Sequence, residues 1–385
     1  MAKAVVSIVK GSDPDQLVKE ATDLLGGIGL FVRPGATVLI KPNVTHPFKP
    51  ETSVCTSPGM VAAVVRLCKS AGAGRVIVGE ASASGMDTKA TYEISGIGAA
   101  AWAAGADDVI DFKGKDTVWV NVPILNGIQI KEVDLPKIAL EADVLISLPI
   151  LKTHFATYMT ASIKNMKGLL KDVDKRRFHR GVLSQAVADL MLARKPDLAI
   201  VDALRPQQGL GPTIGDVIEF GVVLAGADPL AVDATCARVM GFEPAEIEHL
   251  RLAAKHGVGV LEPEHIEVRG RSVQEVQRSF VPPPDNFTGY TEYKLFTENA
   301  CSSCAGCLIA VLETLKRQGK YEQNVGMSIV VGPKDEFPTG CGTGKDLLVM
   351  GNCVAKYRRE GLFAPGCPPQ FTAVMSVIVN REELP

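Results

Sequence analysis

The stretch DVLISLPI at residues 143–150 is an almost uninterrupted apolar run that ends directly before the polar sequence LKTH. Similar runs recur along the first 280 residues. A run that is apolar throughout, rather than at alternate positions, is typical of a strand buried on both faces of a sheet. The other strands that we expect are AVVSIV (4–9), ATVLIKPN (36–43), RVIVGEA (75–81), DDVIDF (107–112), LAIVDAL (198–204) and FGVVLAG (220–226).

Helical patterns lie between these strands. The clearest are PGMVAAVVRLCKSAG (58–72), LSQAVADLMLAR (183–194) and PLAVDATCARVMG (229–241). Asp228 and Pro229 predict the start of the last helix, as an N-cap and a proline in the first turn. Alternation of strands and helices favours an α/β, Rossmann-like fold, in which a mainly parallel sheet is covered by helices.

The composition is that of an ordinary globular protein. A chain of 385 residues is too long for one common core, so we expect two domains. The formal net charge of −2 argues against a nucleic-acid-binding surface. The sequence has neither an apolar stretch that could cross a membrane nor the apolar segment of a signal peptide. We therefore expect a cytoplasmic location without membrane partners.

A proline-rich stretch, FVPPPDNFTG (280–289), interrupts the strand and helix pattern. Three prolines and a glycine cannot continue a helix or a central strand. We predict a main α/β domain at 1–280, a linker at 281–294 and a smaller α/β domain at 295–385. In the tail we expect a cysteine loop, a helix near 308–318, strands near 327–332 and 347–351, a short basic helix and a Cys-Pro-Pro turn.

Six of the nine cysteines lie in the tail, in the segments ACSSCAGC (300–307), TGCGTG (339–344), GNC (351–353) and APGCPP (364–369). Because disulfides are rare in a reducing cytosol, a clustered set indicates metal binding or redox chemistry. The remaining three lie among apolar neighbours and are expected to be small core residues. They are Cys55, Cys68 and Cys236.

The cysteine spacing favours an iron–sulfur cluster. Cys301, Cys304 and Cys307 form a C-x2-C-x2-C run like that of ferredoxins, and a proline follows Cys367 as at the Cys-Pro end of such motifs. Zinc sites more often show two paired C-x2-C knuckles. Zinc and a metal-free redox dithiol are the alternative interpretations.

One [4Fe–4S] cluster requires four cysteine ligands. We expect these to be Cys304, Cys307, Cys353 and Cys367, with Cys301 and Cys341 as extra or substitute ligands, which leaves room for a second cluster. The GCGTGK run at 340–345 lacks the spacing of a phosphate-binding loop, so its glycines are expected to shape the turn around Cys341.

Polar residues follow several predicted strands at the point where each strand ends. In an open α/β sheet, ligands bind outside the carboxyl ends of the strands, near a topological switch point. Cations and amides that converge there with histidines suit a small anion with a carboxylate or phosphate group. The candidate site residues are Lys41, Asn43, Glu80, Lys152, His154, Lys164, Asn165, His179 and Asp202.

Lys152 and His154 are the expected catalytic residues, because they follow a buried strand directly. His154 would donate a proton, since the pKa of histidine lies near working pH. The basic run at 171–177 is expected to be a solvated face. Asp233 is expected to interact with the positive end of its own helix.

The ordered motifs of the main domain resemble one known family, called domain of unknown function 362. The resemblance spans roughly residues 35–260 and rests on VLIKPN, TSPGMVAAVVRL, GEAS, VLISLPILKTH, SIKNMKG, LAIVDAL, LGPTIG and AGADPLAVDATCARVMG. The CAGC, GNC and GCPP motifs of the tail are similar to those of an iron–sulfur subgroup, and family members often join this domain to a ferredoxin-like segment. The resemblance implies the fold and the cluster but assigns no reaction.

An oxidoreductase is the function that we expect, with the cluster delivering electrons to a small anionic molecule, or to a second cofactor, at the strand ends. One alternative is a non-redox isomerase, lyase or transferase with a Lewis-acid or structural cluster. The other is a non-catalytic electron carrier or cluster-delivery protein. A redox partner protein is expected, and a homodimer is compatible with the sequence.

Other cofactors have little support in the sequence. No G-x-G-x-x-G turn follows the first strand, which argues against a nicotinamide cofactor in the usual dinucleotide mode. A flavin is compatible with the fold, but nothing in the sequence requires it.

Overall fold

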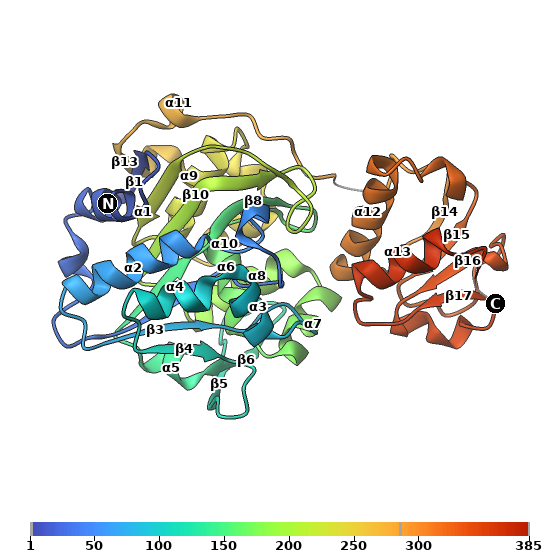
Figure 1. Cartoon of the computed structure of the whole chain (residues 1–385), viewed down its shortest axis with the longest axis horizontal. Coiled ribbons are helices and arrows are strands. Elements are labelled where there is room, and N and C mark those ends of the chain that lie inside the picture. The colour runs from blue at the N-terminus through green and yellow to red at the C-terminus, as the bar shows by residue number, and fades with distance from the viewer. Residues whose placement is uncertain (1–2, 285–286, 384–385) are drawn as a thin grey trace. The chain divides into compact units, whose positions relative to one another are not determined.

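The computed structural model describes residues 3–284 and 287–383 (Figure 1). The chain divides into two compact units. The first contains the residues up to Phe178 together with Val182–Pro283, and the second contains His179–Gly181 and the residues from Pro284 on. Residues 285–286 of the predicted linker lie outside the described residues.

A mainly parallel sheet forms the centre of the first unit, in the strand order β13-β1-β12-β10-β7-β2-β3-β4. Strand β12 is antiparallel to both of its neighbours, and the other pairs along this path are parallel. The predicted α/β fold is thereby confirmed. The strand bounds are Ala4–Lys10 (β1), Thr37–Pro42 (β2), Arg75–Glu80 (β3), Asp108–Asp111 (β4), Val144–Leu148 (β7), Leu198–Gln208 (β10), Val222–Gly226 (β12) and Ile266–Gly270 (β13).

Shorter strands extend this sheet or stand beside it. β8 (Ile150–His154) and β11 (Asp216–Val217) pair with β10, and β9 (Tyr158–Thr160) pairs with β8. β5 (Trp119–Pro123) and β6 (Glu132–Pro136) form a separate antiparallel pair.

Helices cover both faces of the large sheet, because successive residues of its strands are apolar on both sides. In β2, Val38 and Ile40 belong to the core that contains residues of α1 and α2, whereas Leu39 belongs to the core that contains residues of α8 and α9. All three side chains are fully buried. Figure 1 shows these helices around the sheet.

The bounds of α2, α8 and α9 agree with the three predicted helices to within two residues. The α-helices up to residue 283 are Pro14–Asp23 (α1), Pro58–Ser70 (α2), Thr88–Ser95 (α3), Ile97–Ala103 (α4), Lys137–Glu141 (α5), Ser162–Asn165 (α6), Asp172–Arg180 (α7), Leu183–Ala193 (α8), Pro229–Val239 (α9), Glu248–Lys255 (α10) and Val273–Val276 (α11). Asp228 caps α9 as predicted, since its carboxylate accepts from the amides of Leu230 and Ala231.

The strand order changes direction between β2 and β7. From β2 the chain goes on to β3 and β4 on one side, and from β7 it goes on to β10 on the other. Since β10, β7, β2 and β3 are parallel along this path, their carboxyl ends lie at one edge of the sheet. This edge is where open α/β sheets bind ligands.

A smaller parallel sheet forms the second unit, in the order β14-β15-β16-β17. Its strands are Lys294–Phe296, Ser328–Val331, Gly344–Met350 and Gly361–Ala364, and its helices α12 (Ser302–Arg317) and α13 (Phe371–Val379) pack together. Across both units, the described helices include none with the length and apolar character that a membrane span needs.

The prediction of a loop at the cysteine run 300–307 was wrong. Cys301 is the N-cap of α12, and the following residues form its first turns. The reason is that Cys304 continues the buried stripe of this helix, together with Leu308, Val311 and Leu312.

Candidate functional site

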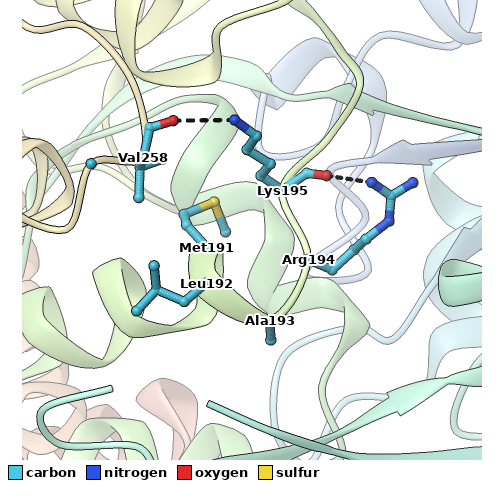
Figure 2. Close-up of a pocket in the computed structure, with 7 residues that line it drawn as sticks. Met191, Leu192, Ala193, Arg194, Lys195 and Val258 are labelled. Carbon is cyan, nitrogen blue, oxygen red and sulfur yellow. Dashed lines mark hydrogen bonds between the residues drawn. The ribbon is translucent and has the colours of Figure 1, made fainter. Parts of the chain in front are cut away.

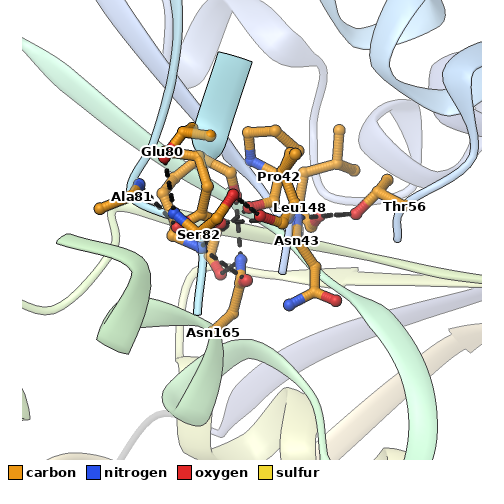
Figure 3. A network of polar contacts seen from close by, with 12 residues as sticks. Pro42, Asn43, Thr56, Glu80, Ala81, Ser82, Leu148 and Asn165 are labelled. Carbon is orange, nitrogen blue, oxygen red and sulfur yellow. Dashed lines mark hydrogen bonds and ion pairs between the residues drawn. The ribbon is translucent and has the colours of Figure 1, made fainter. Parts of the chain in front are cut away.

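Side chains from several strand ends form one buried polar network in the first unit (Figure 3). Lys41, near the end of β2, donates from Nζ to Glu80 Oε2 at 2.6 Å and to Asn165 Oδ1 at 2.8 Å. Glu80 is the last residue of β3, and Asn165 is the last residue of α6. The side chains of Lys41 and Glu80 are only 1% and 2% exposed. Three predicted site residues therefore meet at the switch point of the sheet.

The ion pair of this network is enclosed on every side by hydrogen bonds and by close packing. Glu80 also accepts from the backbone amides of Val44 and Ala81. Asn165 Nδ2 donates to the carbonyl oxygen of Lys41 at 2.9 Å. A β-carbon built on Gly168 would overlap Glu80 Oε1 and Lys41 Nζ, so only a glycine fits beside the pair. Burial lowers the pKa of Lys41, and the charge of Glu80 opposes this effect.

Lys152, in β8, is a second buried ammonium group beside this pair. Its Nζ donates to Asn43 Oδ1 at 3.0 Å and to the carbonyl oxygen of Val54 at 2.6 Å. Both of these acceptors are neutral, although the residue is only 1% exposed. Burial lowers the pKa of Lys152 to about 8. An ammonium group in this setting lacks a directly bound negative charge.

Further lysines lie around the network, and burial lowers the pKa of each of them. Lys175 Nζ donates to the carbonyl oxygens of Ala81 and Ser82, directly after β3. Burial lowers the pKa values of Lys167 and Lys175 to about 7 each. The pKa of Lys164 is lowered well below its usual value by burial and by the charges of Lys167 and Lys152.

The buried position of Lys175 corrects the prediction that the basic run at 171–177 is a solvated face. Lys175 is only 5% exposed. Its helix, α7, carries it onto the residues that follow β3, where backbone carbonyls accept its hydrogen bonds. A tertiary contact of this kind leaves no local pattern in the sequence.

His154 ends β8 and lies near Lys152 along the same strand, with only 5% of its surface exposed. Its Nδ1 accepts a hydrogen bond from the amide of Ala156 at 3.0 Å. Because Nδ1 is the acceptor in this contact, a neutral His154 ring carries its proton on Nε2.

Asp233, in α9, holds the segment that carries Lys164 and Asn165. Its carboxylate is fully buried and accepts from the amide of Ser162 at 2.7 Å and from that of Ile163 at 2.9 Å. These amides begin α6, so Asp233 caps a helix other than its own. This corrects the prediction that Asp233 interacts with the start of α9. The available sequence signal was a lone acidic residue inside the apolar helix PLAVDATCARV.

We expect Asp233→Asn to lower the free energy of unfolding by about 1–3 kcal/mol, because asparagine has one oxygen for two buried amides and leaves one of them without an acceptor. Burial raises the pKa of Asp233 to about 7, above the value of about 3.9 for an unfolded chain. The native state therefore binds more protons between these values, and the contribution of this group falls as pH rises from about 4 to 7. The penalty should be larger at pH 5 than at pH 8 in urea unfolding.

Asp189→Asn is the matched control for this pH dependence. Asp189 is also fully buried and accepts from the amides of Ile128, Gln129 and Ile130, but its pKa is lowered. His256 Nε2 lies 2.8 Å from this carboxylate, so the penalty is measured in a His256→Gln background, where it should not change between pH 5 and pH 8. Equal pH profiles for the two variants would contradict the role assigned to Asp233.

Two predicted site residues lie apart from the network contacts. Asp202 is buried in β10, and its carboxylate accepts from the amides of Ser57 and Leu204 at 2.8 and 3.1 Å. Since Ser57 is the N-cap of α2, Asp202 anchors the start of that helix. His179 lies near the end of α7 and belongs to the second unit. Substrate binding by these two residues stays a prediction.

Cysteines from separate segments of the second unit come together around Gly351. A β-carbon built on Gly351 would lie 3.7 Å from Cys353 Sγ and 3.8 Å from Cys304 Sγ. Cys307 Sγ donates to the carbonyl oxygen of Pro369 at 3.6 Å, in the turn that contains Cys367. The start of α12 therefore meets the segments that carry the other two expected ligands.

Cys301 lies beside Cys304 at the start of α12. A hydrogen bond from the Cys304 thiol, with the amides of Cys304 and Ser303, lowers the pKa of Cys301 to about 6. Helix N-termini favour thiolates in this way, and the thiolate is the form that binds metals. Within residues 3–284 and 287–383, however, no group of three or more His, Cys, Asp or Glu side chains is arranged to hold a single metal ion.

Cys341 lies at the other edge of the small sheet. The amide of Gly342 donates to the hydroxyl of Ser328, the first residue of β15, whereas Cys353 follows the end of β16. Because β15 and β16 are parallel, their first and last residues lie at opposite edges. Cys341 is therefore separated from the group around Gly351. Cys55, Cys68 and Cys236 are buried, as predicted for core residues.

The sequence profile described as Domain of unknown function (DUF362) matches residues 38–238. The chain belongs to this family. The matched range contains every residue of the strand-edge network, from Lys41 to Asn165, and it excludes the cysteine-rich tail.

A curated relative of this DUF362 protein is the thylakoid-associated protein sll1697 of Synechocystis sp. (strain ATCC 27184 / PCC 6803 / Kazusa). It is 31% identical over 242 residues, which cover 61% of this chain and 72% of the relative. Among solved structures, the lactate racemase apoprotein from Thermoanaerobacterium thermosaccharolyticum is 13% identical, with a TM-score of 0.37 over 66% of this chain and 57% of that one. A Thermotoga maritima protein is also 13% identical, with a TM-score of 0.35 over 64% of this chain and 60% of that one. These structural likenesses are too distant to bear on function.

The DUF362 domain also has a surface pocket of about 380 Å³ at the end of α8 (Figure 2). Arg194 and Lys195 contribute its two cationic side chains. Arg194 donates to the carboxylate of Asp197, and Lys195 donates to the carbonyl oxygen of Val258. Both cations are thus used within the chain, and none of the network residues lines the pocket.

Proposed function

We propose that this protein is an iron–sulfur oxidoreductase whose DUF362 domain binds a small anion, with a carboxylate or phosphate group, at the strand carboxyl ends. The observation that carries the proposal is Lys152, a buried ammonium group with neutral acceptors beside an ion pair that is already complete. Such a group does not stabilise a protein, because no direct ion pair offsets the free-energy cost of removing its charge from water. A bound anion would offset this cost.

Residues of the network have distinct roles in this proposal. Lys152 and Lys164 bind the anion by charge-assisted hydrogen bonds, and Asn43 and Asn165 orient the two buried lysines Lys152 and Lys41. His154 exchanges a proton with the substrate through Nε2. The low exposure of these side chains keeps water away and strengthens their electrostatic interactions.

The cysteine-rich tail would hold one [4Fe–4S] cluster through Cys304, Cys307, Cys353 and Cys367, which would supply single electrons to the reaction. The donor set fits this group, because thiols from the start of α12 lie close to the segments that carry the other two cysteines. Gly351 has a positive φ angle of 101°, and the absence of a side chain there leaves space beside the sulfurs of Cys304 and Cys353. A redox partner protein would reduce the cluster.

A cytoplasmic location is part of this proposal, since free thiols persist in a reducing compartment. A non-catalytic electron carrier is the second candidate. It accounts for the cysteines but gives no reason for buried lysines at the sheet edge. A non-redox enzyme with a structural cluster would need the same anion site.

The cluster is tested by anaerobic purification of the full chain, with iron and sulfide analysis, visible absorption and EPR. We expect about four irons per chain. Cys353→Ser should lose most of the iron, because it removes one expected ligand. Cys341→Ser is the matched control and should keep the iron, since Cys341 lies at the opposite edge of the sheet. Colourless, iron-free wild-type protein would refute the cluster, and so would equal losses in both variants.

A further inference from the structure

Charges at the strand edge do not balance. Lys41 is paired directly with Glu80 at 2.6 Å, which accounts for one lysine and one carboxylate. Lys152 donates to two neutral oxygens, and Lys164 Nζ lies 3.3 Å from the hydroxyl of Thr160, which is also neutral. Two further lysine side chains therefore lack a directly bound carboxylate among the described contacts.

The side chains of Lys152 and Lys164 lie near each other. Lys152 is paired with Thr160 across β8 and β9, and Lys164 Nζ lies 3.3 Å from the hydroxyl of Thr160, so the two lysines are close enough to share a ligand. Lys152 is buried, whereas Lys164 is only half-buried and is therefore the more accessible of the two. They lie on β8 and α6, which follow the carboxyl end of β7 in the chain, and the carboxyl ends of the strands are where ligands of α/β folds bind.

We infer that the anion bound at this edge carries at least two negative charges, so that it is a phosphate monoester or a dicarboxylate and not a simple monocarboxylate. This inference rests on the proposed function. A dianion would place a negative charge beside each of Lys152 and Lys164 and so favour the protonated form of both, whereas a monoanion has only one charge for the two amines.

Binding should also take up protons. The charged or titratable groups that act on Lys152 are Cys55, Lys41 and Glu80. Lys164 is affected by Lys167 and Lys152. It also acts on His249, whose pKa is lowered to about 3 by burial and which therefore stays neutral. With a pKa of about 8, Lys152 is only partly protonated at pH 8, and an adjacent anion would complete its protonation.

Isothermal titration of the full chain at pH 8, with ionic strength held constant by chloride, tests the inference. The probes are acetate, malonate and inorganic phosphate. We expect malonate or phosphate to bind at least about tenfold more tightly than acetate. Titrations in two buffers of different ionisation enthalpy should show net proton uptake on malonate binding. The relative affinities of malonate and phosphate distinguish a dicarboxylate from a phosphate monoester.

Lys152→Met should reduce malonate and phosphate binding to the level of acetate, since it removes the buried charge but keeps the volume. Lys164→Met, at a more exposed position, should have the same effect without the risk of misfolding. Lys195→Met is the matched control in the pocket at the end of α8 and should bind as the wild type does.

Each outcome separates the inference from the proposed function. If none of the three anions binds, the proposed anion site itself is refuted. If acetate binds as tightly as malonate and phosphate, the site stands but the requirement for two charges is wrong. If binding is lost in Lys195→Met and kept in Lys152→Met, the anion binds in the α8 pocket and both statements fail.

Discussion

Glu80→Gln should lower the free energy of unfolding by about 3–5 kcal/mol, as expected when one partner of a buried ion pair is removed. The reason is that Lys41 would remain buried with an ammonium group and only neutral acceptors, Asn165 Oδ1 and the carbonyl oxygen of Pro42. Glutamine keeps the size of the side chain, so the effect reports on charge and not on volume. Urea unfolding followed by circular dichroism measures it.

Two controls test whether the loss of stability comes from the burial of this ion pair and not from the removal of a charge as such. Glu141→Gln removes an exposed pair, Lys137–Glu141, whose side chains are 53% and 58% exposed, and should cost no more than about 0.5 kcal/mol. In the double variant Lys41→Met/Glu80→Gln, removal of the orphaned charge should recover most of the loss. A loss for Glu80→Gln as small as that for Glu141→Gln would contradict the importance of this pair.

Seven strands of the main domain and its three predicted helices could be found from the sequence because their patterns are local; the strands are β1, β2, β3, β4, β7, β10 and β12. The strand β8 was missed, so Lys152 and His154 lie within a strand and not after one. The apolar runs around Leu39 and Leu145 belong to strands that are buried on both faces, and their short length and β-branched residues favour a strand over a buried helix. Lys41, Asn43 and Lys152 could be proposed together for the same reason. Parallel strands bring their carboxyl ends to one edge whatever the details of the packing.

The contacts that complete the site depend on tertiary packing and could not be predicted. Asp233 caps α6 only because α9 packs against it, and Lys175 is buried only because α7 crosses the residues after β3. Nothing within a few residues of either side chain indicates these partners. The helix at Cys304 was missed for another reason, since the metal-ligand spacing was taken as a loop although the buried stripe continues through it.

The charged side chains whose burial is energetically unfavourable lie at the strand carboxyl ends, which is the edge where this fold favours ligand binding. Lys41, Lys152 and Lys175 are each at most 5% exposed, and Glu80 is the carboxylate whose charge acts on all three. Packed apolar residues at these positions would stabilise the chain at least as well. A buried excess of positive charge is therefore better explained by binding than by folding.

Gly168→Ala should lower the free energy of unfolding by about 3–5 kcal/mol, through overpacking and through separation of the Lys41–Glu80 pair. The added β-carbon would overlap Glu80 Oε1 and both Nζ and Cε of Lys41, and these side chains are held by hydrogen bonds that leave them no room to move. Gly168 is not among the glycines with positive φ, so alanine meets no backbone strain there and the penalty is steric. Urea unfolding measures the stability, and malonate titration should show that binding is lost as well.

Gly29→Ala is the matched control for this substitution. Gly29 is exposed, has no heavy atom within 4 Å of an added β-carbon, and is likewise absent from the positive-φ glycines. Its stability should change by no more than about 0.5 kcal/mol. In a Lys41→Ala/Glu80→Ala background, which removes the atoms that the methyl group would meet, Gly168→Ala should cost much less than it does alone. An equal cost in both backgrounds would mean that Gly168 acts elsewhere and that the ion pair is not held by the close packing described here.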